Sequence, residues 1–166
     1  MDDGADRGDS RAPHLEDIVK LCKALNAQGA RYLLIGGFAV ILHGFVRTTK
    51  DVGLLVDPSV GNMTRVKRAL AILPDNAAAM VEDDDVQRCT VVRVADEIVV
   101  DLLASAGGIT YDAAVQDGVE TFEIEGVPVP VATKETLIKM KQTVRESDAV
   151  DVRYLRLRIE EERAER

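Results

Sequence analysis

The sequence lacks the features that mark several classes of protein. It has no tryptophan, only two cysteines in 166 residues, and no uninterrupted apolar run of the roughly 18 residues that cross a bilayer. Its first residues are acidic and polar, whereas a signal peptide begins basic and continues apolar. Cys22 and Cys89 lie in apolar patterns without metal-ligand spacing, so we expect two buried thiols rather than a disulfide or a zinc site. These absences predict a soluble, cytoplasmic protein that does not enter a membrane.

Positive charge is also scarce. The chain has 21 Lys and Arg against 29 Asp and Glu, a net charge of −8. Nucleic-acid binding depends on Lys and Arg that neutralise phosphates, so this balance argues against a broad electrostatic grip on RNA or DNA. Residues 1–131 carry 12 basic and 21 acidic side chains, whereas residues 132–166 carry 9 and 8. We therefore expect any phosphate-bearing partner near the C-terminal helices.

The length and composition suit one domain with a hydrophobic core. Hydrophobic residues make up 46% of the 166, which is enough for one core and too little for two of ordinary size. Residues 1–12 are rich in Asp and Gly and show no periodicity, so we expect a disordered tail there. A single domain is expected over residues 13–166.

Hydrophobic periodicity predicts a mixture of helices and strands. Helices are expected at 15–28, 38–43, 59–73, 111–115 and 133–145, with a last one from near residue 148 into the charged tail. Strands are expected at 31–35, 51–56, 88–94, 97–103, 119–124 and 127–131. The tight spacing at Ala95-Asp96 favours an antiparallel hairpin, and the prolines in the last pair of strands suit a sheet edge. The expected fold class is α/β (α+β): a mixed β-sheet flanked by helices, with a helical C-terminus.

The most informative segment begins at Gly36-Gly37 and ends at Gly53. The glycine pair joins a buried strand to an apolar helix, and Arg47-Thr48-Thr49-Lys50-Asp51 leads into the next strand. This order resembles the nucleotidyltransferase superfamily, in which a Gly-Gly or Gly-Ser turn opens a helix and a strand carrying Asp-x-Asp follows. The approach to Asp51 and the ending over residues 136–151 look like the AbiEii/MenA-type toxin nucleotidyltransferases. The resemblance covers residues 15–158.

The resemblance implies a nucleotidyltransferase fold and Mg²⁺-dependent chemistry on a nucleoside triphosphate (NTP). In such sites carboxylates hold metal ions that stabilise charge on phosphate oxygens. Side chains two apart on a strand share a face, so positions 51 and 53 would both face the metal, with a third carboxylate from a neighbouring strand. Asp51 and Asp101 are thus the expected catalytic residues and metal ligands. The alternatives are a strand-start carboxylate for Asp51 and, because Asp101 lies in an apolar strand, a buried ion pair with Arg or Lys.

The resemblance also implies four nucleotide-binding residues, Gly36, Gly37, Arg47 and Lys141. Free N–H groups after a glycine turn attract anions, and guanidinium or ammonium groups pair with phosphate oxygens. Each residue has a structural alternative. These are a tight strand-to-helix turn for the glycines, a brace to Asp51 for Arg47, and a solvated helix face for Lys141.

Three other polar groups are expected to be structural. His43 lies on an otherwise apolar helix and is expected to pack or to bond to the backbone. Asp148 and Asp151 fit the N-terminal cap of a helix better than a ligand pair. The acidic residues 82–85 fit a solvated loop better than a source of a replacement carboxylate.

Gly53 stands where the family pattern places the second Asp, and glycine offers no ligand. Loss of the carboxylate at this position should lower metal affinity or activity by at least the roughly 10- to 100-fold that follows when residues supporting a ligand are removed. Nothing in the sequence requires glycine at this position. Three explanations are open: a natural pseudoenzyme, a substitution introduced into a harmful enzyme, or a site that uses only Asp51 and Asp101 with one metal.

The leading expectation is a toxin-like transferase that moves a nucleoside monophosphate (NMP) from an NTP to an RNA end, such as that of tRNA, or to a protein hydroxyl. Gly53 should leave its turnover weak or absent. The alternative is a non-catalytic module on the same fold that binds a nucleotide or a partner such as a cognate antitoxin. A third alternative, a structural α/β domain with no nucleotide, is favoured if Asp101 pairs with a buried Arg far from Asp51.

Overall fold

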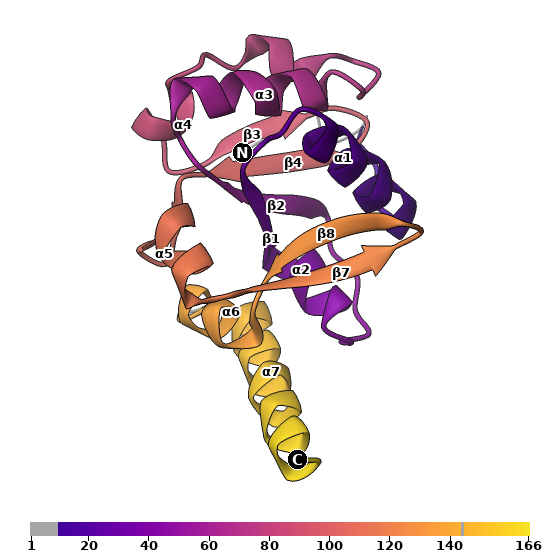
Figure 1. The fold of residues 1–166 in the computed structure, drawn as a ribbon, viewed down its shortest axis with the longest axis vertical. Helices are drawn as coiled ribbons and strands as arrows, with labels where there is room; N and C mark the ends of the chain where they lie inside the picture. The colour runs from indigo at the N-terminus through magenta and orange to yellow at the C-terminus, as the bar shows by residue number, and fades with distance from the viewer. Residues whose placement is uncertain (1–9, 144) are drawn as a thin grey trace.

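The structure is a computed structural model that describes residues 10–143 and 145–166, and Figure 1 shows its fold. The strands are β1 (Tyr32–Ile35), β2 (Asp51–Val56), β3 (Val92–Ala95), β4 (Val99–Leu103), β5 (Ser105–Ala106), β6 (Ile109–Thr110), β7 (Val119–Ile124) and β8 (Val127–Ala132). The helices are α1 (Leu15–Ala27), α2 (Gly36–Leu42), α3 (Val60–Leu70), the 3-10 helix η2 (Ala77–Met80), α4 (Asp85–Arg88), α5 (Tyr111–Asp117), α6 (Lys134–Met140) and α7 (Glu146–Ala164).

Six strands form one mixed sheet in the order β3-β4-β2-β1-β8-β7. β2 runs parallel to β4 and β1 runs parallel to β8, while the β1–β2, β3–β4 and β7–β8 pairs are antiparallel. β5 and β6 form a separate hairpin. The expected mixed sheet flanked by helices, with a helical C-terminus, is confirmed, and the protein belongs to the α/β class.

Apolar side chains on both sides of the inner strands explain why helices cover the sheet. All of β1 is buried, and so are Val52, Leu54 and Leu55 of β2. α1 packs against α3 and β8, while α2 packs against β2, α6 and α7. Strands buried on both faces form continuous apolar runs in the sequence, which is why these two strands are recognisable from it.

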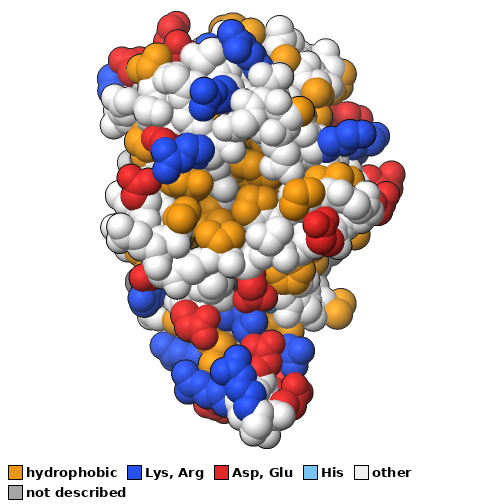
Figure 2. All heavy atoms as spheres, viewed as in Figure 1, with side chains coloured by type: hydrophobic (Ala, Val, Ile, Leu, Met, Phe, Trp, Pro, Cys, Tyr) orange, Lys and Arg blue, Asp and Glu red, His pale blue; other side chains and the backbone are white. Residues whose placement is uncertain are grey.

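The C-terminal helix α7 runs away from the sheet (Figure 1). It is 19 residues long, and most of its side chains beyond Leu155 are charged. Figure 2 shows basic and acidic side chains crowded over this end of the molecule, with hydrophobic ones gathered in the middle of the same face. Within residues 10–143 and 145–166, no helix is long and apolar enough to cross a membrane.

Several boundaries differ from the predictions. β3 begins only at Val92, because residues 85–88 form the helical turn α4. Cys89 is therefore exposed, so the expectation of a buried thiol is wrong for Cys89 and correct for Cys22. β8 is an inner strand and not an edge, because it pairs with β1 at Val131. α6 ends at Met140, well before residue 145.

Residues 10 and 11, which precede the predicted domain start at residue 13, already contact the folded domain. Residues 1–9 of the predicted tail lie outside the described residues. The Ser10 hydroxyl donates to the Asp96 carbonyl at 2.7 Å, and the Arg11 N–H donates to the Glu97 carbonyl at 2.9 Å. Arg11 also donates two hydrogen bonds to the Asp17 carboxylate of α1. Residues 10 and 11 therefore pack onto the turn between β3 and β4.

Asp96 fixes that turn. Its buried carboxylate accepts hydrogen bonds of 2.7–2.9 Å from the backbone N–H groups of Asp75, Ala77 and Glu97. Burial opposes ionisation of Asp96, but the three N–H donors outweigh it, and the pKa is lowered from its ordinary value. The ionised carboxylate thus ties the β3–β4 hairpin to the segment after α3.

We predict that Asp96→Ala lowers the free energy of unfolding at neutral pH by about 1–3 kcal/mol, because the N–H donors lose their acceptor. The lowered pKa means that this stabilisation is complete above the unfolded-state pKa of about 4 and is lost as the pH falls through the folded-state value. Urea denaturation at neutral and acidic pH measures both effects. The exposed neighbour Glu97→Ala is the control and should cost under about 1 kcal/mol; equal costs for the two variants would contradict the anchoring role.

Candidate functional site

Two parallel strands bring the expected catalytic positions together. In the β2–β4 pairing Gly53 lies opposite Asp101, and Asp51 begins β2 two residues earlier. Alternate residues of a strand share a face, so all three positions face the same side of the sheet. They line a single cavity with a volume of about 800 Å³.

The Gly36-Gly37 turn lies beside these positions, on the other flank of β2. Ile35 is the antiparallel partner of Gly53, and α2 starts at the next residue. Gly36 has a φ of +77°, in the left-handed region that favours glycine. A Cβ on Gly37 would lie 2.7 Å from Thr49 Oγ1, so a side chain there would press on the loop before β2. Local packing therefore accounts for both glycines, and their phosphate-binding role stays a prediction.

The opposite wall of the cavity comes from the loop before β2 and from the junction of α6 with α7. Its basic residues are Arg47, Lys50, Lys141 and Arg145. Three of them pair with buried carboxylates of α7. Lys50 is exposed and has no ion-pair partner among the described residues. This wall therefore adds positive charge to a cavity whose other wall carries Asp51 and Asp101.

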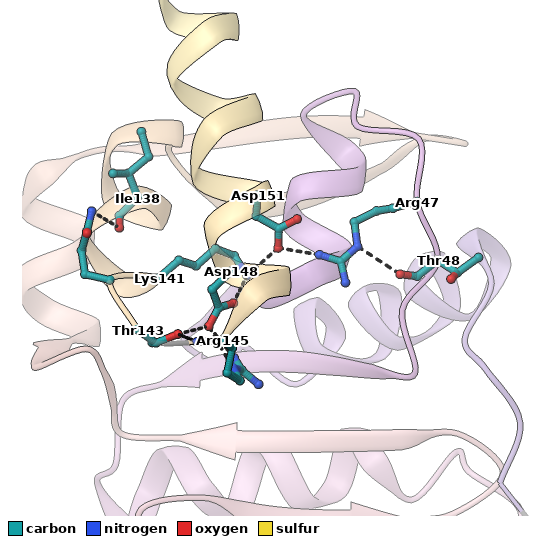
Figure 3. A network of polar contacts seen from close by, with 9 residues as sticks. Arg47, Thr48, Ile138, Lys141, Thr143, Arg145, Asp148 and Asp151 are labelled. Carbon is teal, nitrogen blue, oxygen red and sulfur yellow. Dashed lines mark hydrogen bonds and ion pairs between the residues drawn. The ribbon is translucent and has the colours of Figure 1, made fainter.

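A buried ion cluster joins α7 to the rest of the molecule (Figure 3). Lys141 Nζ lies 3.0 Å from Asp151 Oδ2 and 3.3 Å from Asp148 Oδ1. Arg47 also bonds to Asp151, and Arg145 also bonds to Asp148. The two carboxylates are only 1% and 3% exposed, and Asp151 Oδ1 has no hydrogen-bond partner among the described residues. Charges this deeply buried are tolerated because they are paired.

The cluster changes three interpretations. The solvated helix face expected as the alternative for Lys141 is wrong, because its side chain is 9% exposed. Arg47 braces Asp151 rather than Asp51. Asp148 lies in the first turn of α7, as a cap would, but its oxygens accept hydrogen bonds from side chains of the preceding segment.

Two groups expected to be structural lie outside the cavity lining. His43 is buried, its Nε2 is 2.9 Å from the Ala132 carbonyl oxygen, and its ring meets the edge of Phe122. Burial lowers the pKa of His43, which favours the neutral ring. The expectation of a packed, backbone-bonded histidine is confirmed. Residues 82–85 also lie outside the lining, so they supply no carboxylate for position 53.

Arg93 is the site residue that the sequence did not indicate. It lies opposite Asp101 in the β3–β4 pairing. Its Nε and Nη2 donate to the two Asp101 oxygens at 2.9 and 3.0 Å, and Nη2 lies 3.4 Å from Asp51 Oδ2. Asp101 therefore forms an ion pair with an arginine, as the alternative supposed, but the pair is not the buried one that was expected. Arg93 is 58% exposed and also contacts Asp51. It is therefore not a buried arginine far from Asp51, the finding that would favour a structural domain with no nucleotide.

Asp51 is held in an environment that resists ionisation. Burial and the nearby charge of Asp101 raise the pKa of Asp51, and the positive charges of Arg93, Arg145 and Arg47 offset part of this rise. Two carboxylates on one face repel each other unless a cation lies between them. The Arg93 guanidinium is that cation.

The residues around Asp51 and Asp101 do not fit the expected Mg²⁺ site. Both Asp101 oxygens accept hydrogen bonds from Arg93, and Gly53 has no side-chain oxygen to bind a metal. The part of the chain that the structure describes holds no group of three or more His, Cys, Asp or Glu able to bind a metal. Mg²⁺ needs near-octahedral oxygen ligands, and a guanidinium that occupies the same oxygens also repels the ion.

The backbone at Gly53 tolerates a side chain. Its φ lies outside the left-handed region, and a Cβ would lie 3.4 Å from Ile35 Cγ1 and from the Ile35 carbonyl oxygen, which are ordinary contacts. Nothing in the structure explains why glycine stands at this position.

We predict that Gly53→Ala keeps or raises the free energy of unfolding, by up to about 1 kcal/mol, because glycine weakens a strand interior. Gly36→Ala is the matched comparison and should lower it by about 1–2 kcal/mol, because alanine resists a positive φ. Chemical denaturation of both variants measures the difference. If Gly53→Ala proved the more destabilising of the two, position 53 would have a packing role that the structure does not show.

We predict that Asp151→Ala lowers the free energy of unfolding by about 3–5 kcal/mol, because it leaves Lys141 and Arg47 without their shared partner in a buried site. Asp51→Asn should change it by under about 1 kcal/mol, since Asp51 is partly exposed and its ion pair is long. The same denaturation assay tests both. Similar small losses for the two variants would mean that the ion cluster does not hold α7 in place.

The sequence was also compared with known proteins. No protein-family model matches the chain, and the search of curated proteins finds no match. Its function must therefore be inferred from the cavity and from the residues that line it.

Proposed function

We propose that the chain has a nucleotidyltransferase-like fold and binds the triphosphate of an NTP in the cavity. The observation that carries the proposal is the meeting of Gly36-Gly37, Asp51, Gly53 and Asp101 around one cavity whose opposite wall is basic. Asp101 is distant in sequence from the segment that holds the other positions, and the order of these residues along the chain is the one that the superfamily resemblance implies.

The charges of the cavity suit a phosphate chain. Lys50 is exposed and unpaired among the described residues, and Arg47 and Arg145 present guanidinium groups that also pair with carboxylates. An ammonium or a guanidinium forms strong, charge-assisted hydrogen bonds with phosphate oxygens. Lys141 is held by two buried carboxylates, so it contributes mainly by fixing the position of α7. Gly36 and Gly37 line the cavity where β1 meets α2, with the side chains of Thr49 and Arg47 close to Gly37.

Transfer of NMP to an acceptor, either an RNA end or a protein hydroxyl, should be weak or absent. Asp101 is occupied by Arg93, position 53 offers no ligand, and burial disfavours the ionised form of Asp51. The same observations favour the non-catalytic alternative, in which the function is to bind a nucleotide or a partner such as an antitoxin. A toxin-type transferase would need Asp51 and Asp101 to be available for Mg²⁺.

We predict that calorimetry with each of ATP, GTP, CTP and UTP detects binding of at least one nucleotide. Lys50→Ala should weaken that binding by about tenfold, or 1.4 kcal/mol, through loss of one exposed charge at the cavity. Lys20→Ala, an exposed lysine on α1 away from the cavity, is the matched control and should bind as the parent does. The titrations are run both in Mg²⁺ and in EDTA. Absence of binding of all four nucleotides in both buffers would reject the proposal.

A further inference from the structure

Arg93 contacts both Asp101 and Asp51, the two carboxylates that were expected to hold a metal. The guanidinium bridges the two carboxylates that a metal would otherwise bridge, taking both oxygens of Asp101 and approaching one oxygen of Asp51. Two of its nitrogens each donate to a different Asp101 oxygen, at 2.9 and 3.0 Å, and such two-point contact makes Arg–carboxylate pairs strong. Register supports this contact, because Arg93 and Asp101 are direct cross-strand partners.

We propose that Arg93 is a built-in cation that takes the place of a divalent metal at the Asp51–Asp101 pair, so that the cavity binds phosphate groups without a metal. The part of this inference that concerns phosphate rests on the proposed function. The part that concerns the metal rests only on the contacts of Arg93 and can be tested without any nucleotide.

The charges of Asp51, Asp101 and Arg93 are consistent with an arginine in place of a metal. Two carboxylates and one guanidinium leave one net negative charge, whereas the Asp-x-Asp pattern with Asp101 would supply three carboxylates and no cation. With fewer negative charges the site attracts a divalent ion less, and the guanidinium adds direct repulsion at a distance of a few ångströms. Glycine at position 53 and arginine at position 93 therefore act in the same direction, each making a metal less favourable.

If Arg93 takes the place of a metal, Gly53→Asp alone should not be enough to produce metal binding. The carboxylate added at position 53 would face Asp101 across the β2–β4 pairing, within the same cavity. The Arg93 guanidinium already contacts Asp101 and Asp51, so the added carboxylate would become its third partner before a metal could bind. Restoring the missing carboxylate alone should therefore not create a metal site, whereas removing the arginine should.

The metal test uses Mn²⁺ alone, followed by electron paramagnetic resonance. We expect the parent protein, Gly53→Asp and the charge-preserving Arg93→Lys to bind Mn²⁺ weakly, at the level of the control Arg65→Gln, which changes an exposed arginine of α3. Arg93→Gln should bind at least about tenfold more tightly, and Gly53→Asp combined with Arg93→Gln should bind most tightly. Circular dichroism verifies that each variant is folded. Tight Mn²⁺ binding by the parent or by Gly53→Asp alone, or no gain from removing Arg93, would overturn the proposal.

The phosphate test measures affinity for ATP in EDTA and in Mg²⁺. The parent should bind equally in both buffers. Arg93→Gln should lose about tenfold in EDTA and regain affinity when Mg²⁺ is added, since the metal then replaces the lost cation. Parent binding that requires Mg²⁺ would overturn the proposal. If no variant binds any of the four nucleotides in either buffer, the proposed function fails, while the Mn²⁺ measurements still decide whether Arg93 excludes the metal.

Discussion

The parallel pairing of β2 with β4 is the constraint on which the cavity depends. With Gly53 opposite Asp101, the side chains at 51, 53 and 101 share one face, and a slip of one residue would send Asp101 to the other face. The antiparallel pairing of β1 with β2 then places the Gly36-Gly37 turn at the same end of the sheet. The β3–β4 hairpin adds Arg93 to that face. Three strand registers thus assemble the site before any loop contributes.

The opposite wall of the cavity is held by charge as well as by apolar packing, since Leu155 of α7 is buried in the core and Tyr154 stacks on Phe45. α7 begins just after the α6 helix ends, and its two buried aspartates draw in cations from the loop before β2 and from the end of α6. Buried ions carry a desolvation penalty, so an apolar contact would join the helix at less cost. The ion cluster ties α7 to two other segments at once, because Asp151 pairs with Arg47 of the loop before β2 and with Lys141 at the end of α6.

The sequence was informative about elements and uninformative about contacts between them. Val52, Leu54 and Leu55 belong to a continuous apolar run, and the glycine pair before α2 marks a turn, so both could be predicted from local patterns. The partner of Asp101 could not. A turn at Ala95-Asp96 would give a different register from the observed one, in which Asp96 is held by N–H groups of a distant segment and Arg93 meets Asp101. Lys141 is similar, because its carboxylates lie on another helix.

The two groups of ion pairs in the cavity differ in how easily a ligand could displace them. Lys141 is 9% exposed between two carboxylates that are almost fully buried, so separating them would leave charges stranded away from water. Arg93 is 58% exposed, and Asp51 is 37% exposed, so water can compensate either group when a third ion arrives. Under the proposed function, an incoming phosphate would share the Arg93 cation at modest cost, whereas Lys141 would keep its two carboxylate partners. The ion pairs of α7 are thus closed to solvent, whereas those of Arg93 are open to it.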